Sequence, residues 1–286
     1  MTHTPPTDNS WSLIIKPKKR LLDLHLDDLW RYRDLIVLFV RRDFVAQFKQ
    51  TILGPAWFVV QPLITTIMFT IIFGNIAQLS TDGLPKILFY LSGNILWSYF
   101  AMCLTSTSDT FTANAHLFGK VYFPRLAVPI SVIISNFMKF ALQFVLFLVF
   151  LAYYQISGAD IHMNWAVALI PLLVILMAGL SLGLGIIFSS MTTKYRDLKF
   201  LLQFGVQLMM YATPVIYPMS SIPEKWKAFI WLNPMTPIIE TFRFAFLGKG
   251  DFNWIHLAYS GAFTLVILFL GTVIFNRVEQ TFMDTV

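Results

Sequence analysis

Six long stretches of the chain carry almost no charged residue, and they constrain the possible fold more than any other feature. An α-helix needs about 20 predominantly apolar residues to cross a hydrocarbon core roughly 30 Å thick. The bilayer core offers no water to exposed backbone groups, so such segments must be helical. We therefore predict an all-α integral membrane protein with six transmembrane helices, at about residues 55–77, 87–108, 126–154, 165–190, 198–217 and 253–276.

The composition also indicates a membrane environment. Hydrophobic residues make up 57% of the 286 residues and charged residues only 13%, whereas a soluble domain carries about 25% charged residues. The 28 Phe, 8 Trp and 10 Tyr suit helices that face lipid and belts at the membrane interface. The single cysteine, Cys103, excludes an intrachain disulfide and a thiolate metal cluster within one copy.

The basic residues indicate how the chain is oriented. If the N-terminus is cytoplasmic, that side receives 15 Lys and Arg and the opposite side five, as the positive-inside rule requires. The net charge of +6 is thus a topology signal, and we expect membrane lipid rather than nucleic acid as a partner. Both termini are predicted to be cytoplasmic, with an N-terminal segment at 1–54, a transmembrane domain at 55–277 and a tail at 278–286.

Residues 29–50 have a helical pattern but are too charged to cross a membrane, because only residues 35–40 form an unbroken apolar run. We interpret them as an amphipathic helix on the cytoplasmic interface, called the interface helix here. A cytosolic helix packed on a partner is the alternative. Its apolar residues recur at helical spacing, at Trp30, Val37, Val40, Phe44 and Phe48. The candidate functional residues on it are Trp30, Arg33, Arg41 and Arg42.

Residues 114–125, the connecting segment, link the second and third predicted spans and mix basic with aromatic side chains. A turn or two of helix would present His116, Leu117, Phe118 and Tyr122 to the cytosol, and exposed apolar side chains usually mark a docking surface. An ordinary interfacial loop with aromatic anchors is the alternative. The candidate docking residues are Asn114, His116, Leu117, Phe118, Lys120, Tyr122 and Phe123.

On the opposite side, residues 220–250 are long for a loop and too charged for a span. Pro234 and Pro237 interrupt the helical pattern, so we predict two short helices that dip partway into the outer leaflet. Glu240 and Arg243 are spaced three apart and are predicted to pair on one helix face. Backbone at that depth must be shielded by protein or line a wet cavity, which fits re-entrant helices that form an outer gate.

Two predicted spans carry amides beside aromatic rings. Such a combination suits a path for a sugar polymer, because sugars present hydroxyls around the ring and apolar C–H patches on its faces. Bonds between helices are an equal alternative. The candidate lining residues are Trp57, Phe58, Gln61, Phe204, Gln207, Tyr211 and Tyr217.

Two other features lie within the predicted spans. Lys139 should face protein or water, since an unpaired charge in the membrane costs at least about 2.5–3.5 kcal/mol. A transport role and a structural role both fit it. Gly179, Gly183 and Gly185 place small residues on the fourth predicted span, which predicts close packing of helices.

Several catalytic and nucleotide-binding motifs are missing from the sequence. It contains no Gly-x-x-x-x-Gly-Lys-Ser/Thr phosphate loop, no His-Glu-x-x-His and no Gly-x-Ser-x-Gly elbow. We therefore expect no catalytic residue, cofactor or metal in this chain. Energy for uphill transport would have to come from another polypeptide.

Short segments along most of the chain resemble one protein family. They are LWRYRD at 29–34, FKQTILGPAW at 48–57, QP at 61–62, KVYFPR at 120–125, KYRD at 194–197, PVIYP at 214–218, LNP at 232–234 and RVEQTF at 277–282. Their order and spacing resemble the permease subunits of type-2 ABC exporters for O-antigen, capsular polysaccharide and teichoic acid in bacteria.

The resemblance implies a homodimer in the bacterial inner membrane, bound to two copies of a separate ATPase that would hold ATP and Mg. The interface helix and the connecting segment would dock on that ATPase, the latter as coupling helix. Lys194, Tyr195 and Arg196 would lie near the cytoplasmic entrance and meet a lipid-linked pyrophosphate. An exporter of a drug or lipid, and a membrane enzyme that acts on polyprenyl-linked sugars, are the alternatives.

Overall fold

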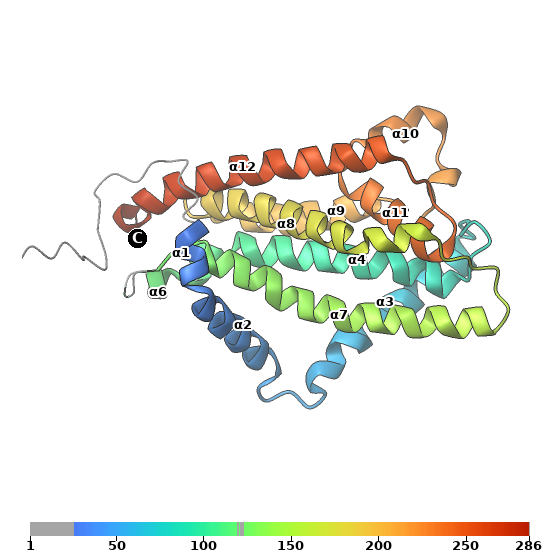
Figure 1. Cartoon of the computed structure of the whole chain (residues 1–286), viewed down its shortest axis with the longest axis horizontal. Helices are drawn as coiled ribbons and strands as arrows, with labels where there is room; N and C mark the ends of the chain where they lie inside the picture. The colour runs from blue at the N-terminus through green and yellow to red at the C-terminus, as the bar shows by residue number, and fades with distance from the viewer. Residues whose placement is uncertain (1–25, 119, 121–122, 286) are drawn as a thin grey trace, which may run out of the picture.

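The computed structural model describes residues 26–118, 120 and 123–285, and within them every regular element is helical and none is a strand. The helices form an elongated bundle (Figure 1). Five helical segments of the described part are long and apolar enough to cross a membrane. These segments are Gly54–Ile76, which contains α3 (Trp57–Phe69), α4 (Lys86–Ser108), α7 (Ala127–Ile156), Trp165–Thr192, which contains α8 (Ile170–Thr192), and Trp254–Val278 of α12 (Trp254–Thr285).

The fifth predicted span, residues 198–217, differs from the prediction. Helix α9 covers only Leu198–Tyr211. Its 14 residues reach about 21 Å at 1.5 Å per residue, which is shorter than a hydrocarbon core of roughly 30 Å. Pro214 cannot donate a helical hydrogen bond and disfavours helix at the residue before it, so the chain turns after Tyr211. The described helices therefore include five candidate spans instead of the six expected.

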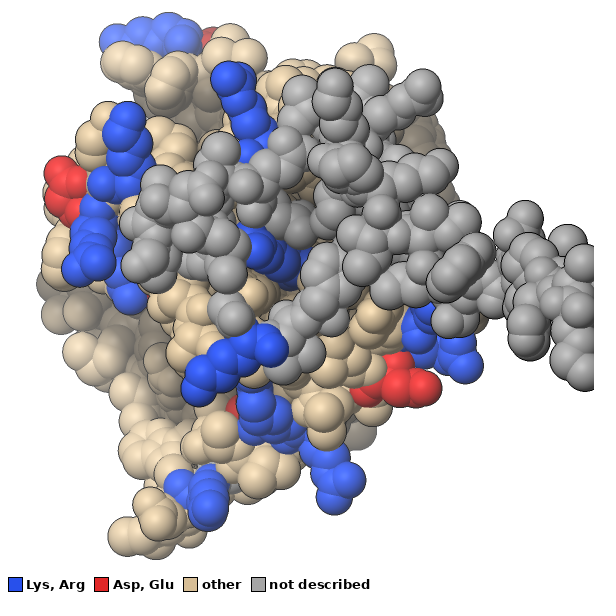
Figure 2. Space-filling view, turned by 90° about the vertical axis from the view of Figure 1, so that its left-hand side faces the viewer, with Lys and Arg blue, Asp and Glu red and all other residues tan. Residues whose placement is uncertain are grey.

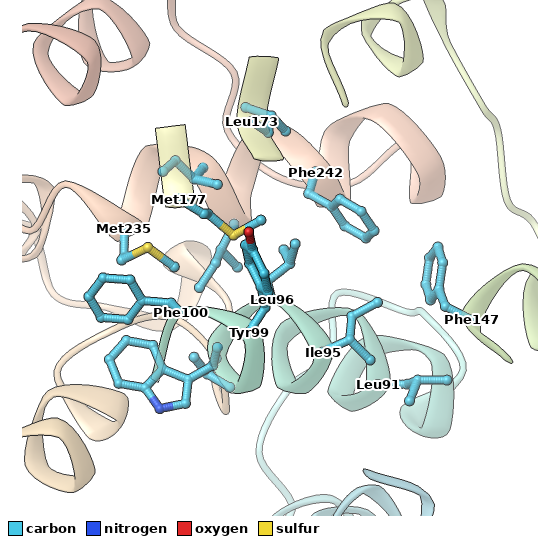
Figure 3. Packing of buried hydrophobic residues seen from close by; sticks show 14 of the residues in the cluster. Leu91, Ile95, Leu96, Tyr99, Phe100, Phe147, Leu173, Met177, Met235 and Phe242 are labelled. Atoms are coloured by element: carbon cyan, nitrogen blue, oxygen red, sulfur yellow. The ribbon is translucent and has the colours of Figure 1, made fainter. Parts of the chain in front are cut away.

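Helix α4 lies at the centre of the bundle. In its most apolar window 78% of the residues are buried, against 11% for the segment that contains α3. It packs against α7, α8 and α11 (Met235–Leu247). Figure 3 shows this core, where α4 side chains meet residues of the three neighbouring helices. The labelled α4 residues are Leu91, Ile95, Leu96, Tyr99 and Phe100, and their neighbours are Phe147, Leu173, Met177, Met235 and Phe242.

Glycines allow α8 and α12 to pack closely, as the sequence predicted. A Cβ added to Gly183 would lie 2.9 Å from the backbone nitrogen of Leu268, and one added to Gly271 would lie 2.7 Å from the Gly183 carbonyl oxygen. Both distances are too short for carbon contacts with backbone atoms. The small-residue pattern of α8 therefore has a packing role.

The two ends of the bundle differ in character. One end, called the basic end here, carries α1 (Leu26–Arg31), α2 (Arg33–Phe48), α5 (Thr110–Ala113), α6 (Ala115–Phe118) and the C-terminal part of α12 (Figure 1). Figure 2 views this end, where Lys and Arg side chains are spread over the visible surface with few Asp and Glu among them. The opposite end, called the far end, carries α10 (Glu224–Trp231) and α11.

Candidate docking surface and translocation path

An aromatic cluster joins the connecting segment to the helices at the basic end. The rings of Phe111 and Phe275 stack with centroids 4.6 Å apart, and the ring of Phe118 lies 5.9 Å from that of Phe111. The ring of Phe123 lies 5.7 Å from that of Phe118 and 5.6 Å from that of Phe39 on α2. The cluster thus ties α2, α5, α6 and α12 together.

This cluster corrects one expectation from the sequence. Phe118 was expected to face the cytosol, but its side chain is buried, and so is that of Phe123. Packing in the aromatic cluster removes the apolar surface of both rings from water, which is favourable, and exposure to the cytosol would forfeit that free energy. The sequence cannot distinguish an anchor from a docking residue here, because a helix this short has no second turn to define a face.

The remaining candidate docking residues divide by exposure. His116 and Lys120 are exposed, whereas Asn114 and Leu117 are half-buried. The Asn114 side-chain amide donates to the Thr110 carbonyl at 3.0 Å, which fixes the start of α6 to α5. Tyr122 lies outside the described residues. Among the described docking candidates of the connecting segment, those that face outwards, His116 and Lys120, are therefore polar or basic.

The residues predicted to form the interface helix are helical, as α1 and α2 with a break at Tyr32, and their place on the membrane interface stays a prediction. Leu29 and Phe39 are buried in the aromatic cluster, and α2 packs against α7. Of the apolar face predicted from the sequence, Trp30 is 73% exposed and Val37 65%, whereas Val40 and Phe44 are half-buried. The helix thus has one apolar face for the bundle and a second that faces outwards.

The basic residues of this helix make local contacts. The Arg42 guanidinium lies 4.8 Å from the centre of the Phe39 ring and pairs with Asp43 at 2.8 Å. The Arg33 guanidinium lies 5.6 Å from the centre of the Trp30 ring. Arg41 is exposed. These positive charges therefore lie on the outward side of the helix.

The candidate lining residues lie on surfaces that a single copy leaves open. On α3, Trp57 and Gln61 are exposed and Phe58 is half-buried. On α9, Phe204, Gln207 and Tyr211 are exposed. The Tyr217 hydroxyl, half-buried beyond the end of α9, donates to the Tyr211 carbonyl at 2.9 Å.

Each of these two helices packs one face on α4, so its amide and aromatic residues point outwards. Within the described part of the chain, one copy leaves these residues on an open surface and does not enclose a path between them.

Lys139 faces protein, as its position in a span required. Its side chain is 5% exposed, and its ammonium donates to the Asn136 amide oxygen at 2.8 Å. The ammonium also lies 5.4 Å from the centre of the Phe58 ring at the start of α3. Lys139 therefore joins α7 to α3 through a ring that the sequence had placed on the candidate path.

The far end is organised around Arg243, which lies on α11 and is 2% exposed. It pairs with Glu240 at 3.3 Å, as the spacing predicted. Its guanidinium also donates to the carbonyl oxygens of Pro214 and, at 2.8 Å, Val215, in the turn that follows α9. The guanidinium carbon lies 3.8 Å from the centre of the Phe89 ring on α4. Arg243 therefore links α11 with α4 and with the outer end of α9.

The predicted pair of short helices corresponds to α10 and α11, and the two are buried to very different degrees. Helix α10 has no buried residue, whereas α11 is enclosed by α4, α8 and α12 almost throughout. Pro234 and Pro237 are buried at the start of α11. The backbone of α11 is thus shielded by protein, which is one of the two conditions that the sequence argument set for this segment.

Lys194, Tyr195 and Arg196 form the turn between α8 and α9 and are all exposed. The Lys194 ammonium lies 5.4 Å from the centre of the Tyr195 ring. The structure adds Lys199 next to this turn, where it pairs with Asp109 at 2.7 Å. The sequence did not predict this ion pair, because Asp109 and Lys199 are 90 positions apart and no local pattern joins them.

These features define the class of the protein: a multi-pass helical membrane protein with a basic end that carries short helices. A family model described as "ABC-2 type transporter" matches residues 34–247. The chain therefore belongs to the ABC-2 type transporter family.

Curated relatives match most of the chain. The O-antigen export system permease protein RfbA of Klebsiella pneumoniae is 30% identical over 253 residues, which cover 88% of this chain and 94% of that protein. The protein of the same name from Myxococcus xanthus is 25% identical, with coverage of 91% and 98%. The polysialic acid transport protein KpsM of Escherichia coli is 24% identical, with coverage of 85% and 93%.

Proposed function

We propose that this chain is the non-catalytic permease subunit of an ABC exporter that moves a polysaccharide such as O-antigen, carried on a lipid, out of the cytoplasm. The similarity to O-antigen permeases over nearly the whole length of both chains carries the proposal. In this assignment two copies span the bacterial inner membrane with cytoplasmic termini. Two copies of a separate ATPase hold ATP and Mg and dock at the basic end.

The open surfaces of α3 and α9 support a path formed between two copies. Their exposed rings and amides would line it once a second copy covers them, so the hydroxyls and apolar faces of a sugar each meet a matching group. The exposed Lys194 and Arg196 would receive the anionic lipid carrier on the cytoplasmic side. Helix α11 would gate the outer mouth, held in place by the Glu240–Arg243 pair.

Deletion of the gene tests the proposal. Cells that lack this chain should accumulate the polysaccharide in the cytoplasm and lose it from the surface, and a plasmid copy should restore export. Accumulation of a lipid or a drug instead would assign a different substrate. If the purified chain alone transported polysaccharide or hydrolysed nucleotide, the proposed division of labour with an ATPase would be wrong.

We expect Trp57→Ala together with Tyr211→Ala to reduce polysaccharide export several-fold while the complex still assembles. Each exposed ring offers an apolar face on which the C–H patches of a sugar can pack, and the alanines remove both faces. Export is measured in cells, and assembly by co-purification with the ATPase. Tyr153→Ala is the matched control, because Tyr153 is an exposed ring outside the candidate path. Unchanged export in the double variant would remove the case for an aromatic path.

We expect His116→Asp together with Lys120→Glu to weaken association with the ATPase while membrane insertion is unchanged. Both side chains are exposed on the connecting segment, so replacing them with carboxylates changes the charge that this segment presents to a docked partner. Co-purification at low ionic strength measures the loss. Lys225→Glu, an exposed reversal at the far end, should leave association intact. Phe118→Asp should instead lower the yield of folded protein, because Phe118 is buried.

A further inference from the structure

The two ends of α9 are attached to the rest of the molecule in different ways. At the outer end, the buried Arg243 guanidinium holds the Pro214 and Val215 carbonyl oxygens. At the basic end, Lys199 in the first turn of α9 pairs with Asp109 at 2.7 Å. The Lys199 and Asp109 side chains are 45% and 27% exposed. The outer attachment is thus fixed within protein, whereas the other lies at the surface.

Asp109 lies where α4 ends and α5 begins. Its carbonyl oxygen accepts hydrogen bonds from the Ala113 backbone at 2.8 Å and from the Thr112 hydroxyl at 3.1 Å. Helix α5 is in turn bound to Asn114, the first residue of the connecting segment, through the Thr110 carbonyl. A continuous set of hydrogen bonds therefore joins the start of the connecting segment to Asp109.

The Asp109 side chain itself is held in one direction. Its Oδ2 atom faces Lys199, while its Oδ1 atom is buried and has no hydrogen-bond partner among the described residues. A carboxylate enclosed on one side cannot turn freely towards solvent. The Asp109 carboxylate therefore joins the end of α4 to the Lys199 ammonium in the first turn of α9.

We propose that Asp109 and Lys199 are positioning residues that transmit movement of the connecting segment to α9, which pivots about the outer end held by Arg243. This inference rests on the proposed function, in which the connecting segment docks on the ATPase and α9 lines the path. Neither residue is assigned a contact with nucleotide or polysaccharide. Their role is to couple ATP hydrolysis to a change in the width of the path at the basic end.

A charge swap tests the pair in the complete complex of both subunits in lipid vesicles. We expect Asp109→Lys and Lys199→Asp each to lower the polysaccharide exported per ATP hydrolysed by up to about fivefold, the equivalent of the roughly 1 kcal/mol that a partly exposed ion pair can contribute. The double variant, which restores opposite charges, should recover most of that ratio. Subunit association, measured by co-purification, should stay unchanged throughout. If the ion pair only stabilised the fold, the amount of polysaccharide exported per ATP hydrolysed would not change in a complex that still assembles.

Matched variants keep the test decisive. Arg277→Asp reverses an exposed charge on α12 near the basic end and should leave the ratio unchanged. Asp109→Asn and Lys199→Gln remove the attraction without adding repulsion and should give smaller losses. Single reversals with an unchanged ratio, or a swap that fails to recover it, would overturn the inference. A wild-type complex that exports no polysaccharide would overturn the proposed function first.

Discussion

Replacing Arg243 by alanine is expected to cause the largest loss of stability of any single change considered. The substitution leaves the Glu240 carboxylate buried without its partner and leaves the Pro214 and Val215 carbonyl oxygens without their donor. Removing one member of a buried ion pair costs about 3–5 kcal/mol. We expect little folded protein in the membrane fraction and a strongly lowered unfolding temperature for what is recovered in detergent.

Two further variants separate the ion pair from the carbonyl contacts. Arg243→Met with Glu240→Met removes both charges, and a buried ion pair replaced in this way often costs little. We expect the double variant to remain unstable, because the carbonyl oxygens after α9 still lack a donor. Recovery of normal stability would show that the charge pair alone matters. Arg41→Ala, which removes an exposed guanidinium, serves as the control.

Gly183→Ala is expected to have the second largest effect. The added Cβ would lie 2.8 Å from a side-chain carbon of Ile267 and 2.9 Å from the Leu268 backbone nitrogen. The backbone of α12 cannot move away without disturbing its whole contact with α8. Overpacking of this kind typically costs about 1–3 kcal/mol. Thermal unfolding of the purified protein, followed by circular dichroism, measures the loss.

Gly205→Ala on α9 is the matched control for this substitution. No atom lies within 4 Å of the added Cβ at that position. Alanine is also a better helix former than glycine by up to about 1 kcal/mol. We therefore expect unchanged or slightly raised stability. Equal destabilisation by both substitutions would contradict the argument that the contact between α8 and α12 is responsible.

The membrane-spanning helices could be predicted wherever a long run of apolar residues is enough to specify a span. Helices α4, α7, α8 and α12 contain no proline beyond their first turns, and their hydrophobicity was enough to predict them. The fifth predicted span was too long, because charge-free length was counted across Pro214. That proline and Pro218 were the local signals that the helix stops early.

Contacts between distant segments decide the rest of the candidate site. Glu240 and Arg243 were paired from their spacing, because a helix brings residues three apart onto one face. The contacts of Arg243 with Ser92 and Val215 join residues 151 and 28 positions apart, and no local pattern signals them. Phe118 likewise packs on Phe111, whose ring stacks on Phe275 near the other end of the chain.

The central place of α4 also has a consequence for synthesis, because α4 enters the membrane before most of the helices that cover it. It is the second spanning segment to leave the ribosome and the least hydrophobic of the five, with buried polar groups such as Ser92. Helix α3 is made before α4, whereas α7, α8 and α11, which also cover it, are all made later. In a nascent chain arrested before Ala127, the face of α4 that these three helices cover is left facing lipid with its polar groups unshielded, at a cost in free energy. Such a truncated product would be a substrate for membrane quality control.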